Sequence, residues 1–209
     1  MSTPTTVPPT FGEPTPLGLF GLAIGCASLL PVAFGVQSAF TPDALRLTAW
    51  FCLLFGGGCQ FLAGLMSFAN KNSLGGTLLT TFSFNWVLNW WSLCQMAEGR
   101  LPNPAVVLSV DITFLVIFLV MTVAFGYFSK TLFVFLLDID ALYVLRIAKE
   151  VFHAPALALP IALATVALMA IALYIAFALV LNPVAGRAVF PIAGPLFTPQ
   201  PPPGAPPPA

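Results

Sequence analysis

Six long apolar runs divide this chain between residues 16 and 181. They cover residues 16–36, 44–69, 74–97, 105–127, 130–148 and 156–181. A helix needs about 20 apolar residues to cross the roughly 30 Å hydrocarbon layer of a bilayer, and each run is close to that length. Of the 209 residues, 59% are hydrophobic and 7% charged, whereas soluble domains carry about 25% charged residues. The sequence predicts an all-α integral membrane protein with six transmembrane helices in one bundle.

The breaks between these runs contain residues that begin or end helices. Thr41-Pro42-Asp43 is typical of a helix start, and residues 70–73 separate the second run from the third. Ser129-Lys130 leaves so short a connection that the fourth and fifth helices are expected to be antiparallel neighbours. An even number of spans places both chain ends on one side of the membrane. Positive residues are divided almost evenly between the two sides, so they do not fix the orientation.

The two ends of the chain differ from its apolar middle. Residues 1–13 are rich in Thr and Pro, and residues 195–209 contain PQPPPGAPPPA, which favours an extended polyproline conformation and cannot bury a core. The sequence predicts a flexible N-terminal tail over 1–13, a transmembrane domain over 14–194 and a disordered proline-rich tail over 195–209. The first residues lack the basic start and apolar core of a cleaved signal peptide, so the first run is expected to be retained.

Charge and cysteine placement argue against several function classes. Seven Lys/Arg balance seven Asp/Glu, so no electrostatic field points to nucleic acid. The four cysteines lie in apolar runs without a CxxC pair or clustered histidines, which is typical of small buried residues rather than metal ligands. The sequence has no nucleophile and base pair in a sensible context, no phosphate-binding loop and no dinucleotide fingerprint. We expect neither enzyme activity nor a cofactor.

Several segments resemble the acetate uptake transporter family of succinate-acetate permease type. EPTPLGL at Glu13–Leu19 is similar to the family motif N-P-x-P-L-G-L, with Glu13 in the Asn position. LLFGGGCQFLAG at residues 53–64 resembles its small-residue stretch, and NSLGGTLLTTFSFNW at residues 72–86 resembles the segment that follows. SKTLFVFLL and LNPVAGRAVFPIAGP resemble its fifth helix and C-terminal signature. The resemblance covers most of residues 13–195 in order.

This resemblance implies a urea-channel-like, six-helix protomer within a hexameric ring. Each protomer of the family has its own pathway for acetate or a similar small monocarboxylate, usually coupled to protons. The resemblance therefore implies a multi-pass channel or symporter in the cytoplasmic membrane, with a small carboxylate, protons and lipid as partners. Phe82 stands where the family has Tyr, Asn85 stands for Phe, and Asp138 and Asp140 interrupt a segment that is usually apolar. Two alternatives stay open: passive conduction of urea-like solutes, and a structural subunit without transport.

Polar residues in the third run are candidates for the substrate pathway. Asn85 and Asn89 are one turn apart and share a helix face with Phe82 and Trp86. Such a strip suits a pore that offers a carboxylate a few donors, although an amide clamp between helices explains it equally well. Gln60, flanked by glycines, has the same two interpretations. The predicted pathway comprises Pro14, Pro16, Gly18, Gln60, Phe82, Asn85, Trp86 and Asn89.

Three carboxylates lie within apolar runs, where an ionised group is costly. Asp111 is interpreted as an interfacial residue near the start of its helix, stabilised by the helix dipole and headgroup water. Asp138 lies about 12 Å beyond Lys130 along its helix, which places it near the midplane as either a proton relay or an interhelical hydrogen-bonding group. Asp140 is about 200° further round the helix, so the two groups are expected to face different neighbours.

Overall fold

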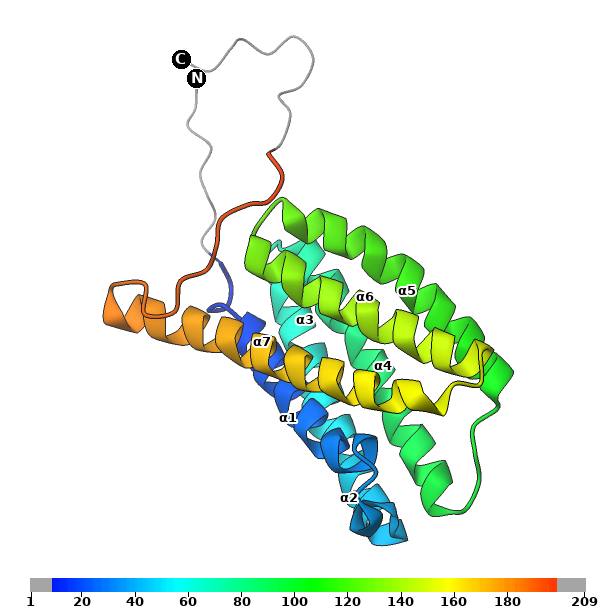
Figure 1. Cartoon of the computed structure of the whole chain (residues 1–209). Helices are drawn as coiled ribbons and strands as arrows, with labels where there is room; N and C mark the ends of the chain where they lie inside the picture. The colour runs from blue at the N-terminus through cyan, green and yellow to red at the C-terminus, as the bar shows by residue number, and fades with distance from the viewer. Residues whose placement is uncertain (1–8, 199–209) are drawn as a thin grey trace, which may run out of the picture.

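Each of the six apolar runs forms a helical rod in the computed structural model, which describes residues 9–198 (Figure 1). The described residues form no β-strand, and the predicted all-α six-helix fold is confirmed. Predicted tail residues 1–8 and 199–209 lie outside the described part. The helical segments are α1 (Thr15–Ala33), α2 (Pro42–Phe51), a π-helical segment (Cys52–Cys59), α3 (Gln60–Ala69), α4 (Ser73–Ala97), α5 (Pro104–Gly126), α6 (Lys130–Val151) and α7 (Ala158–Ala185), with short 3-10 turns at Gln37–Phe40 and Pro155–Leu157.

Side-chain caps begin four of these helices, α2, α4, α5 and α6, where the sequence places polar residues. The Thr41 hydroxyl accepts a hydrogen bond from the Ala44 amide at 3.3 Å, which confirms the predicted helix start. The side-chain oxygens of Asn72 and Asn103 accept from backbone amides in the first turns of α4 and α5. Because the first amides of a helix have no partner within it, these caps fix where each helix begins.

The second apolar run differs from the regular helix that its composition predicts. Its middle, Cys52–Cys59, has π-helical hydrogen bonding, in which the turn is wider than in an α-helix. Gly56 lies in this segment directly against the indole ring of Trp86. A backbone of glycines allows this close approach, because any side chain at Gly56 would collide with the ring. The run therefore packs through its backbone at the point where α4 presents the Trp86 side chain.

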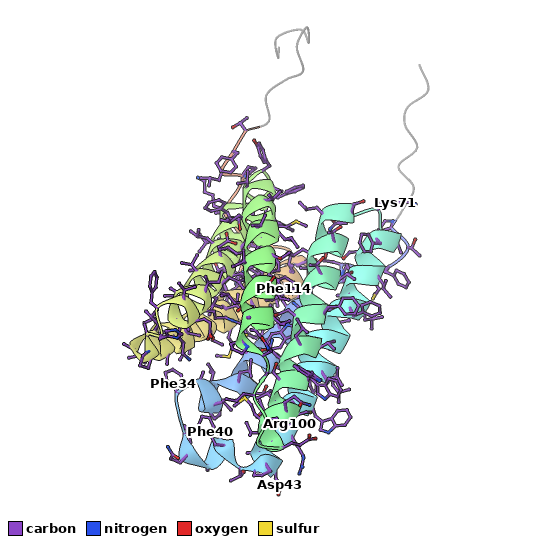
Figure 2. All side chains as sticks on the ribbon, turned by 90° about the vertical axis from the view of Figure 1, so that its right-hand side faces the viewer. Phe34, Phe40, Asp43, Lys71, Arg100 and Phe114 are labelled. Atoms are coloured by element: carbon purple, nitrogen blue, oxygen red, sulfur yellow. The ribbon has the colours of Figure 1, made fainter. Side chains whose placement is uncertain are left out.

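Four helical segments are long and apolar enough to cross a membrane: Thr15–Ala33, Pro42–Ala69, Pro104–Gly126 and Pro155–Ala185. The remaining two, α4 and α6, have 25 and 22 residues, or about 37 and 33 Å at 1.5 Å per residue. They are long enough to cross but more polar. Figure 2 shows Lys71 at one end of the bundle and Asp43 and Arg100 at the opposite end. The chain is a helical membrane protein.

Helix α1 packs along α7 and the π-helical segment, while α3–α4 and α5–α6 form two hairpins (Figure 1). The α5–α6 hairpin is the antiparallel pair that the short Ser129-Lys130 connection predicts. After α7, the chain turns at Gly186 in the left-handed region (φ 61°) and runs back to this hairpin. The Gly126 carbonyl accepts hydrogen bonds from the Leu196 and Phe197 amides. These residues belong to the segment predicted as the C-terminal tail, and they contact the bundle.

Candidate functional site

Two cavities lie inside the bundle and open toward its opposite ends. The wide cavity, of about 720 Å³, is lined by side chains of α1, α4, α5, α6 and α7. Its lining includes Leu101, which follows Arg100 in the sequence. The narrow cavity, of about 270 Å³, is lined in part by Glu13 and by Asn72, which follows Lys71 in the sequence. Because Arg100 and Lys71 mark opposite ends of the bundle (Figure 2), the cavities approach each other from the two membrane faces.

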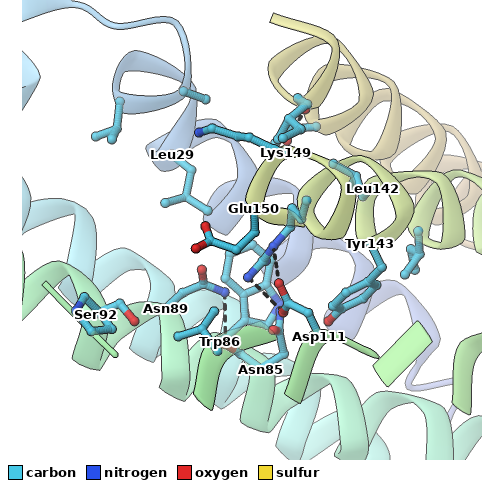
Figure 3. A pocket seen from close by; sticks show the side chains of 18 of the residues that line it. Leu29, Asn85, Trp86, Asn89, Ser92, Asp111, Leu142, Tyr143, Lys149 and Glu150 are labelled. Atoms are coloured by element: carbon cyan, nitrogen blue, oxygen red, sulfur yellow. Dashed lines mark hydrogen bonds and ion pairs between the residues drawn. The ribbon is translucent and has the colours of Figure 1, made fainter. Parts of the chain in front are cut away.

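One wall of the wide cavity is a polar strip on α4. Asn85, Asn89 and Ser92 line it together with Phe82 and Trp86 (Figure 3). The Asn89 amide nitrogen donates to the Asn85 carbonyl within the same helix, at 2.9 Å. Within residues 9–198, neither asparagine side chain forms a hydrogen bond to another helix. Four of the predicted pathway residues are thus brought together at one cavity, and the amide clamp between helices is not formed.

The facing wall contains an ion pair between α5 and α6. Arg146 donates from Nε to Asp111 Oδ2 at 3.1 Å and from Nη2 to Asp111 Oδ1 at 3.0 Å (Figure 3). The Asp111 side chain is 9% exposed and that of Arg146 is 33% exposed. Asp111 therefore has a guanidinium partner inside the bundle, which differs from its predicted stabilisation by headgroup water. The sequence contains a signal for this pair, because both residues lie at matching positions on either side of the Ser129 turn.

Two further residues of this lining each have a fully buried polar atom without a hydrogen-bond partner among the described residues. The Tyr143 side chain is 3% exposed, and its hydroxyl has no hydrogen-bond partner among the described residues. The same holds for Trp86 Nε1, whose indole packs against Gly25 and Gly56. The Arg146 guanidinium carbon lies 5.6 Å from the centre of the Tyr143 ring. Tyr143 and Arg146 were not among the sequence-predicted site residues, because Tyr143 belongs to no motif and the position of Arg146 becomes informative only when α5 and α6 are paired about the Ser129 turn.

The narrow cavity contains fewer polar groups. Glu13, Thr15, Gln60 and Asn72 contribute to a lining that is otherwise mostly apolar. Gln60 is 1% exposed, and its Oε1 has no partner within the part of the chain that the structure describes. The Glu13 carboxylate accepts hydrogen bonds from the Thr15 backbone amide, at 3.0 Å, and from the Thr15 hydroxyl. Among the predicted pathway residues, Gln60 is the one that lines the narrow cavity and not the wide one.

The three N-terminal residues of the predicted pathway are buried in the helix packing. Pro14, Pro16 and Gly18 are buried and line neither cavity. A Cβ atom at Gly18 would lie 2.9 Å from Leu79 Cδ2 and 3.2 Å from Ala63 Cβ. Gly18 therefore allows α1 to approach α3 and α4, while the neighbouring Glu13 and Thr15 face the cavity.

Phe82 and Ile139 line both cavities and separate one from the other. We call these two side chains the septum. The Phe82 ring packs edge-on against Phe118 and Trp86, with ring centres 5.2 and 6.2 Å apart. Both septum residues are buried. The space inside the bundle is therefore two vestibules with an apolar barrier between them.

The two α6 carboxylates face different surroundings. Asp140 Oδ2 accepts a hydrogen bond from the Thr122 hydroxyl of α5 at 2.6 Å, and Asp140 Oδ1 has no partner among residues 9–198. Asp138 lines neither cavity, and its Oδ2 is buried without a partner in the same range. The proton-relay role of Asp138 stays a prediction.

Together these features define a multi-pass helical membrane protein whose interior holds two vestibules on either side of an apolar septum. Among solved structures, the chain is similar to the bacterial acetate channel SatP, with a TM-score of 0.77 and 22% sequence identity. The alignment covers 88% of this chain and 100% of that channel chain. At this identity the likeness establishes the fold, which is the one that the sequence resemblance implies.

Among curated proteins, the chain is 33% identical over 89 residues to the "Glyoxylate pathway regulator" of Yarrowia lipolytica. This match covers 43% of the present chain and 32% of that protein. It therefore spans about a third of the length of the curated relative. No protein-family model matches the chain.

Proposed function

We propose that this protein is a channel or transporter for acetate and similar short-chain monocarboxylates, located in the cytoplasmic membrane. The observation that carries the proposal is the pair of vestibules that meet at Phe82 and Ile139 within one chain. The fold shared with a bacterial acetate channel supports it. The solute would enter one vestibule, pass the septum and leave through the other, so each protomer would have its own pathway.

The chemistry of the septum favours the neutral acid as the species that crosses. Moving an ionised carboxylate into an apolar environment costs far more than moving a neutral polar group. Phe82 and Ile139 offer an ion no hydrogen bond, whereas Asn85 and Asn89 can hold a carboxyl group just before the barrier. A proton would then cross with the acid, so uptake would be coupled to protons. Asp138 is proposed as an alternative proton carrier, tested by Asp138→Asn.

The test is uptake of labelled acetate by vesicles that contain the purified full chain. We expect faster uptake than in protein-free vesicles and a further acceleration when the outside is made more acidic than the lumen. Asn85→Ala should slow uptake, because it removes an amide from the wall of the wide cavity. Leu88→Ala is the matched control, since Leu88 is an exposed apolar residue on the same helix. Equal uptake with and without protein would exclude the function.

A structural role without transport is the second candidate, because the septum separates the vestibules in this structure. It predicts no protein-dependent uptake and co-purification with a larger membrane complex. Passive conduction of urea-like solutes predicts uptake that ignores the pH gradient. We also propose a homo-oligomer, hexameric by resemblance to the family. Light scattering of the detergent-solubilised protein tests this number, and a monomeric mass would contradict it.

A further inference from the structure

The two vestibules differ in the charge of the side chains that line them. In the narrow cavity, Glu13 is the only acidic or basic residue of the lining, and the other polar side chains are amides and a hydroxyl, which carry no charge. The lining of the wide cavity contains two acidic and two basic residues, whose formal charges cancel: Asp111, Glu150, Arg146 and Lys149. The narrow vestibule therefore carries a net negative charge, and the wide one does not.

The Glu13 carboxylate is anchored at the start of α1. Its Oε1 accepts hydrogen bonds from the Thr15 backbone amide, at 3.0 Å, and from the Thr15 hydroxyl. The Thr15 amide has no acceptor within the helix, because it belongs to the first turn. A neutral glutamine oxygen accepts the same bonds. The local structure therefore explains a polar side chain at this position and leaves the charge itself unexplained.

No described cation neutralises Glu13 through an ion pair. Residues 1–8 and 199–209 contain no Lys or Arg. Lys71 lies at the same end of the bundle (Figure 2) but lines neither cavity, and Lys130 lines a separate groove between α6 and α7. Helix dipoles do not offset the charge either, because α1, α4 and α6 begin at this end and α3, α5 and α7 end there.

A fixed charge beside a mostly apolar cavity sorts solutes by their own charge. Glu13 is exposed and also lines the narrow cavity, so its carboxylate lies where the cavity meets water. A unit charge several ångströms away in water changes the local concentration of a monovalent ion about threefold. Anions become scarcer by this factor and cations more abundant, whereas the concentration of a neutral solute is unchanged.

We propose that Glu13 is a specificity-determining residue of the narrow vestibule, where its carboxylate disfavours small anions and admits neutral acids. The inference rests on the proposed function, in which the neutral acid is the species that passes the septum. Ionised acid is kept from the narrow side of Phe82, and the neutral acid enters without a charge penalty. The wide vestibule, whose charges cancel, makes no such distinction.

The test measures charge selectivity directly in the full chain in nanodiscs, without flux. Leu132→Cys places a thiol in the lining of the narrow cavity, and mass spectrometry follows its reaction with three methanethiosulfonates that carry a sulfonate, a quaternary ammonium or an uncharged methyl group. Adding Glu13→Gln should speed the sulfonate about threefold, slow the ammonium about threefold and leave the methyl reagent unchanged. Leu74→Cys lines the same cavity and provides a second position.

Two controls separate the effect of Glu13 from a general change. Leu142→Cys places the thiol in the wide cavity, where Glu13→Gln should leave all three rates unchanged. Glu98→Gln removes a negative charge from a residue that lines neither cavity, and it should not alter the labelling of Leu132→Cys. A change of equal size at Leu142→Cys, or with Glu98→Gln, would overturn the assignment to Glu13.

The outcomes distinguish this inference from the proposed function. Protein-dependent acetate uptake together with labelling rates that Glu13→Gln leaves unchanged would keep the function and overturn the role of Glu13. Charge-dependent labelling without any uptake would support the charge selectivity of the narrow vestibule and exclude transport. No reaction of any reagent at Leu132→Cys or Leu74→Cys would show that the narrow cavity is closed to solutes, which also overturns the proposal.

Discussion

Breaking the Asp111–Arg146 pair should destabilise the bundle unequally, depending on which partner is removed. Arg146→Ala leaves a carboxylate whose side chain is 9% exposed. Loss of one partner from a buried pair costs about 3–5 kcal/mol, and we expect this range. Asp111→Ala leaves a guanidinium that is 33% exposed to the wide cavity, where water can solvate it. Its expected cost is lower, about 2 kcal/mol, near that of one charge-assisted hydrogen bond.

The double variant with alanine at both positions completes a mutant cycle. Each single substitution already removes the ion pair, so the sum of the two single effects counts its loss twice. The double variant should therefore cost less than that sum, with a coupling free energy of about 2 kcal/mol. The assay is reversible unfolding of the full chain in mixed micelles, with wild type, both single variants and the double variant measured together. The control is the Asp43–Arg46 pair, whose atoms are 3.6 Å apart and whose side chains are largely exposed. It should show no measurable coupling.

A milder effect of Arg146→Ala than of Asp111→Ala would contradict the burial argument. Coupling no larger than that of the surface pair would show that the two side chains do not interact in the membrane-inserted protein. In either case, the Asp111–Arg146 pair in the wall of the wide cavity would lose its support.

Two further substitutions test the packing of the bundle. Gly56→Ala should destabilise it by about 1–3 kcal/mol, the usual cost of overpacking, because the new Cβ would meet Trp86 Cγ at 2.6 Å. Gly58→Ala is the control, because a Cβ there would have its nearest neighbour at 3.7 Å. A similar loss of stability in both variants would contradict the argument. Thr122→Ala should cost about 1–3 kcal/mol, because it removes the hydrogen bond that Asp140 accepts in the described structure; unchanged unfolding would show that this bond contributes nothing.

The helices were predictable because each apolar run has the length that a bilayer demands and ends at residues that cap or break helices. Thr41 and Ser129 act in this way, and the α5–α6 hairpin follows from the short connection. The π-helical segment was not predictable, because apolar periodicity records which face of a helix is buried and not how its turns are hydrogen-bonded. The contact of Gly56 with the Trp86 ring of another helix could not be read from the run alone either.

The candidate site was predictable where its residues share one helix. Phe82, Asn85, Trp86 and Asn89 gather at the wide cavity because helical spacing places them on one face of α4. The partners that come from α5 and α6 could be found only by placing two helices side by side. The apolar run that contains Asp111 has no cation to pair with it. Considered one run at a time, the sequence therefore predicted that water stabilises this carboxylate. Its pairing with a charge on α6 is a tertiary property.

Transport itself is tested by the rate at which labelled acetate enters vesicles under an acid-outside gradient, with wild type, Phe82→Ala and protein-free vesicles compared side by side. We predict that wild type exceeds the protein-free rate and that Phe82→Ala is faster still, because it removes the ring that separates the two vestibules. Identical rates in all three preparations would mean that no pathway runs through this chain.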